Sequence, residues 1–148
     1  MSNAVSRSLR SAHVPARVIA GVFIAHSGFD KWRGDEATAA AVHGMASGTY
    51  PFLAKLGPER FLKLLAAGEI AVGVAVALPV VPERVAGAAL TGFSGALLGL
   101  YARTPGLRKP HSIWPTQQGI PISKDAWLFG IGLTLLAESF AAKAAPHT

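Results

Sequence analysis

Four apolar stretches, each roughly as long as a membrane span, alternate with polar or proline-rich links along the chain. They cover about residues 14–32, 60–80, 84–103 and 124–142. About 20 helical residues rising ~1.5 Å each cross the ~30 Å hydrocarbon core of a bilayer. The pattern therefore predicts an all-α fold, a transmembrane four-helix bundle whose antiparallel helices run up, down, up and down.

The links predict how these helices are joined. Residues 57–59 form a good helix start, because a proline fits the first turn and an acid suits the positive end of the helix dipole. The turn at residues 79–83 is short, so the third helix returns beside the second. Residues 35–45, inside the first long link, are alanine-rich and predict a short extra helix. The second long link, 104–122, contains four prolines that forbid a continuous helix.

The composition supports a membrane protein made of one domain. Hydrophobic residues make up 51% of the chain and charged residues 15%, against about 25% in soluble domains. There is no cysteine, which excludes disulfides and thiolate metal sites. The net charge is +6, but the basic residues flank apolar runs, where they face lipid head groups. We therefore expect one integral membrane domain over residues 1–148. The expected partner is the lipid bilayer, and no nucleic acid is expected. The charge pattern leaves open which face of the protein lies in the cytoplasm.

The second apolar stretch, Phe61 to Val81, reads FLKLLAAGEIAVGVAVALPVV and carries one acid, Glu69, near its middle. A carboxylate in hydrocarbon is costly, so it is turned inward, protonated or paired, and it is a candidate functional residue. His26 is expected ~9 Å below the loop face and Glu69 ~12 Å below it, nearly the same depth. Two interpretations stay open: a structural lock between two helices, or a site that handles a proton or binds a polar ligand such as a quinone. Asp30, four residues after His26, can instead pair with the histidine.

Four further residues are candidates for polar contacts. Arg17 and Glu138 lie near the same end of their helices, which predicts a structural ion pair. In the second long link, Trp114 is most simply an interface anchor and His111 an exposed residue; the alternative is a loop that folds over the bundle and closes a site above Glu69. No two histidines have a helical spacing, so no metal site is predicted.

The third apolar stretch carries no charge between residues 85 and 102, and it contains several glycines. Gly95 and Gly99 are four residues apart, the small-residue spacing that lets two helices approach closely. This spacing predicts a closely packed face. A homo-oligomer joined through Gly95 and Gly99 is one arrangement that would use it.

Two sequence segments carry a resemblance to a known family. The first helix contains RVIAGVFIAHSGFDKWRG, and the second leads into the third as AAGEIAVGVAVALPVVPERVAG. With the four-span layout, these segments resemble the DoxX family of small four-helix membrane proteins over most of residues 17–102. The chain departs from the family pattern through Ser27, between His26 and Gly28, and through the long proline-rich link before the fourth helix.

The resemblance implies a multi-pass protein of the bacterial inner membrane. His26, Lys31 and Glu69 match the family pattern by position. The implied function is a small membrane subunit of an oxidoreductase complex, in thiosulfate or related redox metabolism, that binds or reduces quinone with other subunits as partners. The alternative is a non-catalytic membrane scaffold or anchor for a soluble partner. Whether the chain is itself catalytic stays open.

Overall fold

A computed structural model describes the backbone of residues 2–144 and the side chains of residues 13–141, and all regular secondary structure in this part is helical. The predicted all-α class is confirmed. The long helices are α1 (Ser2–Trp32), α3 (Pro58–Ala77), α4 (Glu83–Arg103) and α6 (Asp125–Ala144). The short ones are α2 (Glu36–Thr49), the 3-10 helix η1 (Pro51–Lys55) and α5 (Ile120–Ser123).

Local sequence signals explain where several helices begin. Asp35 precedes α2, and its Oδ1 accepts a hydrogen bond of 2.8 Å from the backbone N–H of Thr38, which satisfies one free donor of the first turn. Pro58 occupies the first turn of α3, as the sequence predicts. α2 is the extra helix expected in the first long link. α1 differs from the expectation, because it begins at Ser2 and continues through Pro15.

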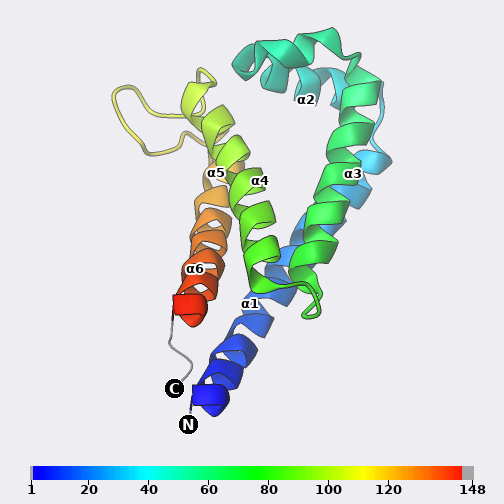
Figure 1. Cartoon of the computed structure of the whole chain (residues 1–148). Coiled ribbons are helices and arrows are strands. Elements are labelled where there is room, and N and C mark those ends of the chain that lie inside the picture. Colours follow the sequence, from blue (N-terminus) through cyan, green and yellow to red (C-terminus); the bar gives the residue numbers. More distant parts are fainter. Residues whose placement is uncertain (1, 145–148) are drawn as a thin grey trace.

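The four long helices form two antiparallel pairs. α1 packs along α3, and α4 packs along α6. Figure 1 shows that the pairs come together at the α3–α4 turn and diverge toward the other end, where α2 and η1 lie across the top. α1 begins and α6 ends at the end of the molecule opposite to α2, so the helix directions follow the predicted up-down-up-down order.

Glycines set the close contact within each pair. A Cβ atom added to Gly73 of α3 would collide with the backbone of Gly21 and Ala25 in α1. A Cβ atom added to Gly87 of α4 would lie 3.0 Å from the carbonyl oxygen of Gly132 in α6. Small residues at a helix crossing let the backbones approach, which is typical of helix packing in membranes.

Gly95 and Gly99 contact other helices of the same chain. A Cβ atom added to Gly95 would lie 3.4 Å from the ring of Phe129 in α6, and one added to Gly99 would collide with the hydroxyl of Tyr50. The Tyr50 hydroxyl donates a hydrogen bond of 2.7 Å to the carbonyl oxygen of Ala96. The predicted close-packed face is therefore used inside the chain, and the homo-oligomer through these glycines stays a prediction.

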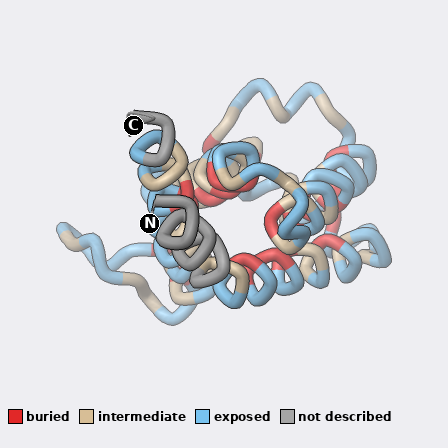
Figure 2. Tube along the Cα trace, turned by 60° about the horizontal axis from the view of Figure 1, so that its bottom comes forward, coloured by how far each residue is buried: buried red, intermediate tan, exposed pale blue. Residues whose placement is uncertain are grey.

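Among the described residues, most of the buried apolar side chains fall into two clusters. The cluster nearer the α3–α4 turn contains Ala20, Ile24, Val76, Ala86 and Leu90. The cluster beneath α2 contains Ala46, Phe61, Leu100, Tyr101 and Leu107. Large apolar side chains also cover the outside, and Figure 2 shows that exposed positions follow the outer sides of the helices. These exposed side chains include Ile19, Val22, Phe23, Leu64, Val74, Val85, Trp127, Leu133 and Phe140.

Two helical segments are long and apolar enough to cross a membrane: α4, and the segment Ile120–Ala141. α1 and α3 are also long, but they contain the charged residues Arg17, Lys31 and Glu69. The helical layout predicted from the sequence is therefore present. Membrane-spanning character by length and hydropathy belongs to two of the four predicted spans.

Candidate functional site

Glu69 lies on the inner face of α3. Its side chain is 4% exposed, and Ala66 and Gly73, about one turn before and after it, are also buried. Gly73 contacts the backbone of α1, so this face of α3 is the one that packs on α1. The carboxylate is therefore held between two helices, as a buried acid requires.

The partner of Glu69 is Lys31, near the end of α1. The Lys31 Nζ atom lies 3.0 Å from Glu69 Oε2, and it also donates a hydrogen bond of 2.7 Å to Ser27 Oγ, one turn earlier in α1. The Lys31 side chain is 25% exposed and Glu69 is nearly enclosed. A buried carboxylate needs a partner of opposite charge to stay ionised, and Lys31 supplies it together with a direct hydrogen bond.

Asp125, the first residue of α6, is a third charged group of this site. It is half-buried, and it lies within electrostatic reach of both Glu69 and Lys31. The site therefore holds two carboxyl groups and one ammonium group. With all three ionised it carries an excess negative charge, so a single proton restores neutrality. The sequence shows Asp125 only as a first-turn acid, and its position at the start of an apolar helix is the signal that could have identified it.

His26 does not contact Glu69, and the expected pair is wrong. The His26 side chain is 74% exposed, and its Nε2 lies 3.5 Å from Asp30 Oδ2. The cause is the direction of the side chain. Gly28 faces α3, and each helical residue turns by about 100° around the helix axis. His26, two residues before Gly28, is therefore turned by about 200° from the direction that faces α3. Lys31, three residues after Gly28, lies within about 60° of that direction. The alternative in which Asp30 takes the histidine is the arrangement observed.

Arg17 does not pair with Glu138 either, and this prediction is also wrong. Arg17 is 4% exposed, and its guanidinium donates to the carbonyl oxygens of Val76 at 2.9 Å, Leu78 at 2.8 Å and Val81 at 3.1 Å. The last carbonyl groups of a helix have no partner inside the helix and carry its negative dipole end. The end of α3 therefore offers Arg17 several acceptors at once.

Glu138 contacts a histidine that the sequence did not single out. Its Oε2 lies 3.1 Å from Nε2 of His13, while Glu83 at the start of α4 lies 3.7 Å from Nδ1 of the same ring. His13 thus connects α1 with both α4 and α6. This contact lies at the end of the molecule opposite to α2, away from Glu69.

The second long link leaves the bundle instead of covering Glu69. Figure 1 shows the link as a loop that projects beside the end of α4. Trp114 is 68% exposed, and His111 is also exposed. The loop is tied back to α4 by the Tyr101 hydroxyl, which donates a hydrogen bond of 2.7 Å to the carbonyl oxygen of Ile113. The loop therefore does not close the site in this structure.

No protein-family model, curated protein or solved structure matches this chain. Within the part of the chain that the structure describes, no group of three histidine or acidic side chains is placed to hold a metal ion. What the geometry offers is a buried Lys–Glu pair with a second carboxyl group nearby, an arrangement suited to holding and moving a proton.

Proposed function

We propose that this chain is a multi-pass protein of the bacterial inner membrane, similar to DoxX proteins, with four membrane-spanning helices. In this proposal it is a small subunit of an oxidoreductase complex, and its Lys31, Glu69 and Asp125 exchange protons with a bound quinone. The observation that carries the proposal is the Lys31–Glu69 contact of 3.0 Å, held between two helices that also expose large apolar side chains.

The distribution of side chains supports a lipid environment. Phe23 and Phe140 are 77% and 64% exposed, whereas Arg17 and Ser94 are 4% and 0% exposed. In water, large exposed apolar side chains and buried charges are both unfavourable. In a bilayer, apolar side chains meet lipid tails, and charges turn toward partners inside the bundle.

The three tryptophans support the same environment. Trp32 ends α1, Trp127 lies in the first turn of α6, and Trp114 lies in the loop beside the end of α4. They are 48%, 71% and 68% exposed. All three lie toward the α2 end of the bundle, and tryptophan is enriched where a membrane meets water. The α2 end therefore suits one membrane surface.

The chemistry of the site fits a quinone head group. Such a head group has two carbonyl oxygens, which accept hydrogen bonds and take up protons when the ring is reduced by two electrons. Lys31 Nζ is a hydrogen-bond donor, and Glu69 and Asp125 are two proton carriers near it. The chain has no cysteine for thiol redox chemistry. The proposal therefore assigns electron supply to another subunit and proton exchange to this one.

Membrane placement can be tested directly, because the chain has no native cysteine. We expect cysteines introduced at Gly57 and at Val80 to react with a water-soluble maleimide from opposite sides of intact membranes. A cysteine at Phe23, on the outer face of α1, should react only after detergent is added. Rapid labelling at position 23 in intact membranes would contradict the proposal.

Quinone binding is tested by removing the buried charge. Glu69→Gln keeps the shape of the side chain, and Glu59→Gln on the exposed first turn of α3 is the matched control. Quinone should co-purify with the wild type and with Glu59→Gln in mild detergent, and Glu69→Gln should retain much less. Quinone-dependent activity of the purified complex should follow the same order. Equal quinone content in all three proteins, or none in any, would argue against the assignment.

A second candidate function is a non-catalytic anchor for a soluble partner, favoured by the exposed basic residues toward the α2 end. These residues are Arg33, Lys55, Arg60, Lys63, Arg103, Arg108, Lys109 and Lys124. Such a surface suits an acidic partner. Pull-down from membranes with these charges neutralised is the test, and an unchanged set of captured proteins would remove its support.

A further inference from the structure

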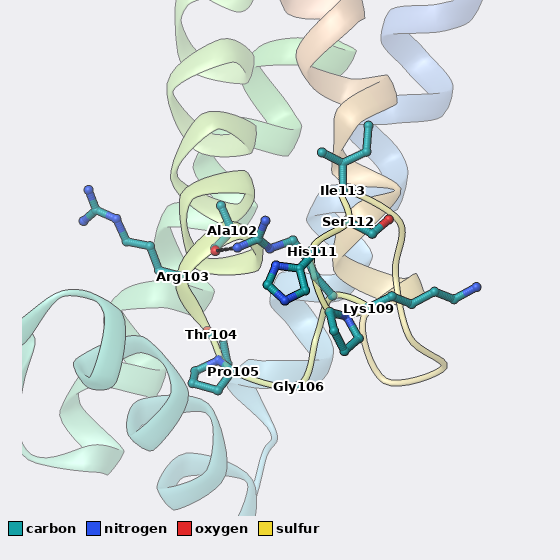
Figure 3. Close-up of a pocket in the computed structure, with 11 residues that line it drawn as sticks. Ala102, Arg103, Thr104, Pro105, Gly106, Lys109, His111, Ser112 and Ile113 are labelled. Carbon is teal, nitrogen blue, oxygen red and sulfur yellow. Dashed lines mark hydrogen bonds between the residues drawn. The ribbon is translucent and has the colours of Figure 1, made fainter.

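A pocket of about 530 Å³ lies between the end of α4 and the loop that follows it. Figure 3 shows the loop curving away from α4, with the ring of His111 turned toward the open space. The lining includes four residues that bear basic side chains: Arg103, Arg108, Lys109 and His111. Figure 3 shows the side chains of Arg103 and Lys109 extending outward on opposite sides of the pocket, so their charges lie at its rim. The pocket is separate from the Lys31–Glu69 site, and none of its lining residues takes part in that site.

The positive charge of this pocket is not neutralised by the chain. There is no Asp or Glu between Glu83 and Asp125. Among the described residues, no salt bridge includes Arg103, Arg108 or Lys109. Charges of one sign lining a concave surface raise the local concentration of ions of the opposite sign. The pocket therefore favours an anion.

The loop around the pocket is held by backbone hydrogen bonds. Lys109 N–H donates to the carbonyl oxygen of Trp114 at 2.9 Å, and Thr116 N–H donates to that of Leu107 at 2.9 Å. The Arg108 side chain is tied to the end of α4, because its Nη2 donates a hydrogen bond of 2.6 Å to the carbonyl oxygen of Ala102. The remaining N–H groups of this guanidinium are free to contact an anion, within the part of the chain that the structure describes.

His111 has an unusual backbone conformation. Its φ angle is 54°, in the left-handed region that favours glycine. Strained residues of this kind concentrate at binding sites, where the conformation aims a side chain at a ligand. The strained residue here is His111, whose ring faces the open side of the pocket.

We propose that this pocket binds a phosphate group, carried by an anionic phospholipid head group at the membrane surface. Arginine and lysine are the side chains best suited to phosphate oxygens, arginine through paired N–H groups and lysine as a compact charge. Two large apolar side chains adjoin the pocket: Ile113 is 77% exposed and Trp114 is 68% exposed. This combination of cations with apolar side chains is typical of segments that lie in the head-group layer.

The test compares two variants that lose equal charge. Arg108→Gln with Lys109→Gln removes two of the three arginine and lysine charges of the lining, and Lys55→Gln with Arg60→Gln is the control, exposed toward the same end but outside the lining. Each full-length protein, in nonionic detergent, is titrated with short-chain phosphatidylglycerol by native mass spectrometry. Two surface cations account for an affinity change of about 30-fold. We expect a loss of that order in the pocket variant and a loss below about threefold in the control.

Two further probes distinguish the source of the phosphate. Short-chain phosphatidylcholine carries the phosphate without net charge, and inorganic phosphate, titrated by calorimetry, carries no lipid. Preference for phosphatidylglycerol, lost in the pocket variant, supports the proposal. Binding of inorganic phosphate alone supports the pocket as a phosphate site and overturns its assignment to lipid. Equal losses in the pocket and control variants, or no loss in either, overturn the proposal.

His111→Gly separates binding from folding. Glycine adopts the left-handed conformation without strain, so the melting temperature of the variant should equal or exceed that of the wild type. The same change removes the ring from the pocket, so phosphatidylglycerol binding should fall severalfold. Unchanged binding would show that the His111 ring has no role in the site.

Discussion

The sharpest stability prediction concerns Arg17, which joins α1 to the end of α3. Its guanidinium donates to the carbonyl oxygens of Val76, Leu78 and Val81 at 2.9, 2.8 and 3.1 Å, and the residue is 4% exposed. Arg17→Met keeps much of the apolar stem and removes all three bonds. The carbonyl groups of Val76 and Leu78 close α3, where a cation also stabilises the negative end of the helix dipole, and that of Val81 lies in the turn to α4.

The size of the effect follows from these contacts. A hydrogen bond from a charged donor contributes about 1.5–3 kcal/mol, so three give an upper bound of about 9 kcal/mol. Leu78 is exposed and Val81 is partly buried, so water can replace part of what their carbonyl groups lose. We therefore expect Arg17→Met to lower the free energy of unfolding by about 3–5 kcal/mol. Arg17→Lys should lose about half as much, because an ammonium cannot reach all the acceptors with a planar fork.

The assay is equilibrium unfolding in mixed micelles, followed by circular dichroism. Arg84→Met is the control, since Arg84 is an exposed cation in the first turn of the next helix, and its effect should stay below about 0.5 kcal/mol. If Arg17→Met lowers the free energy of unfolding by less than about 1 kcal/mol, the hydrogen bonds from Arg17 to the backbone carbonyl groups do not stabilise the fold as argued. If Arg17→Lys is as stable as the wild type, the positive charge stabilises the fold and the planar shape of the guanidinium does not.

Three further predictions use other contacts. Gly73→Ala should destabilise the fold by about 1–3 kcal/mol, because the new methyl group meets the backbone of α1. The control is Gly68→Ala on the same helix, whose methyl group meets nothing within 4 Å and which should be neutral or stabilising. Chemical denaturation compares the two variants. Lys31→Met should lower the free energy of unfolding by about 3–5 kcal/mol, because it leaves Glu69 buried without a partner. The double variant Lys31→Met with Glu69→Leu should recover most of that stability in the same assay, but it should not recover quinone-dependent activity. Hydrogen bonds from the side chain and backbone of the first turn of α2 hold the pKa of Asp35 below its usual range. The cap therefore stabilises α2 above pH ~4, and this stabilisation is lost as the pH falls through the lowered pKa. The difference in melting temperature between wild type and Asp35→Ala should accordingly shrink below pH ~4.

The sequence predicts the helices better than it predicts their contacts. Apolar runs and the Gly57–Glu59 start signal place the long helices, because both depend on local chemistry. Depth along a helix also follows from the sequence, since each residue rises by ~1.5 Å. The direction in which a side chain points requires knowing which face of the helix is packed. That is why His26 and Glu69 were expected together, although Lys31 is the residue on the packed face.

Arg17 and Asp125 show the other limits of sequence reasoning. Pairing Arg17 with an acid is natural, because acids are the visible opposite charges in a sequence. The backbone carbonyls at the end of α3 are equally good acceptors, and only the structure shows that they lie within reach. Asp125 follows a long link whose one regular element is the short helix α5, so its distance from Glu69 depends on how α6 packs. Contacts across such links cannot be read from local patterns.

Three of the charged residues that lower the hydropathy of α1 and α3 have partners inside the bundle, whereas His26 and Asp30 of α1 are exposed. Arg17 is bonded to carbonyl groups at the end of α3, and Lys31 bonds Glu69. In the other pair, Ser94 Oγ donates to the carbonyl oxygen of Leu90 at 2.6 Å, and Thr134 Oγ1 donates to that of Gly130 at 3.0 Å although Thr134 is exposed. Groups satisfied in this way need no water, which is the condition that a bilayer imposes on polar groups. Hydropathy counts a charge in the same way whether it meets lipid or a partner helix, so a low hydropathy does not by itself exclude α1 and α3 as proposed spans. These internal contacts are consistent with the proposal that all four long helices lie in lipid.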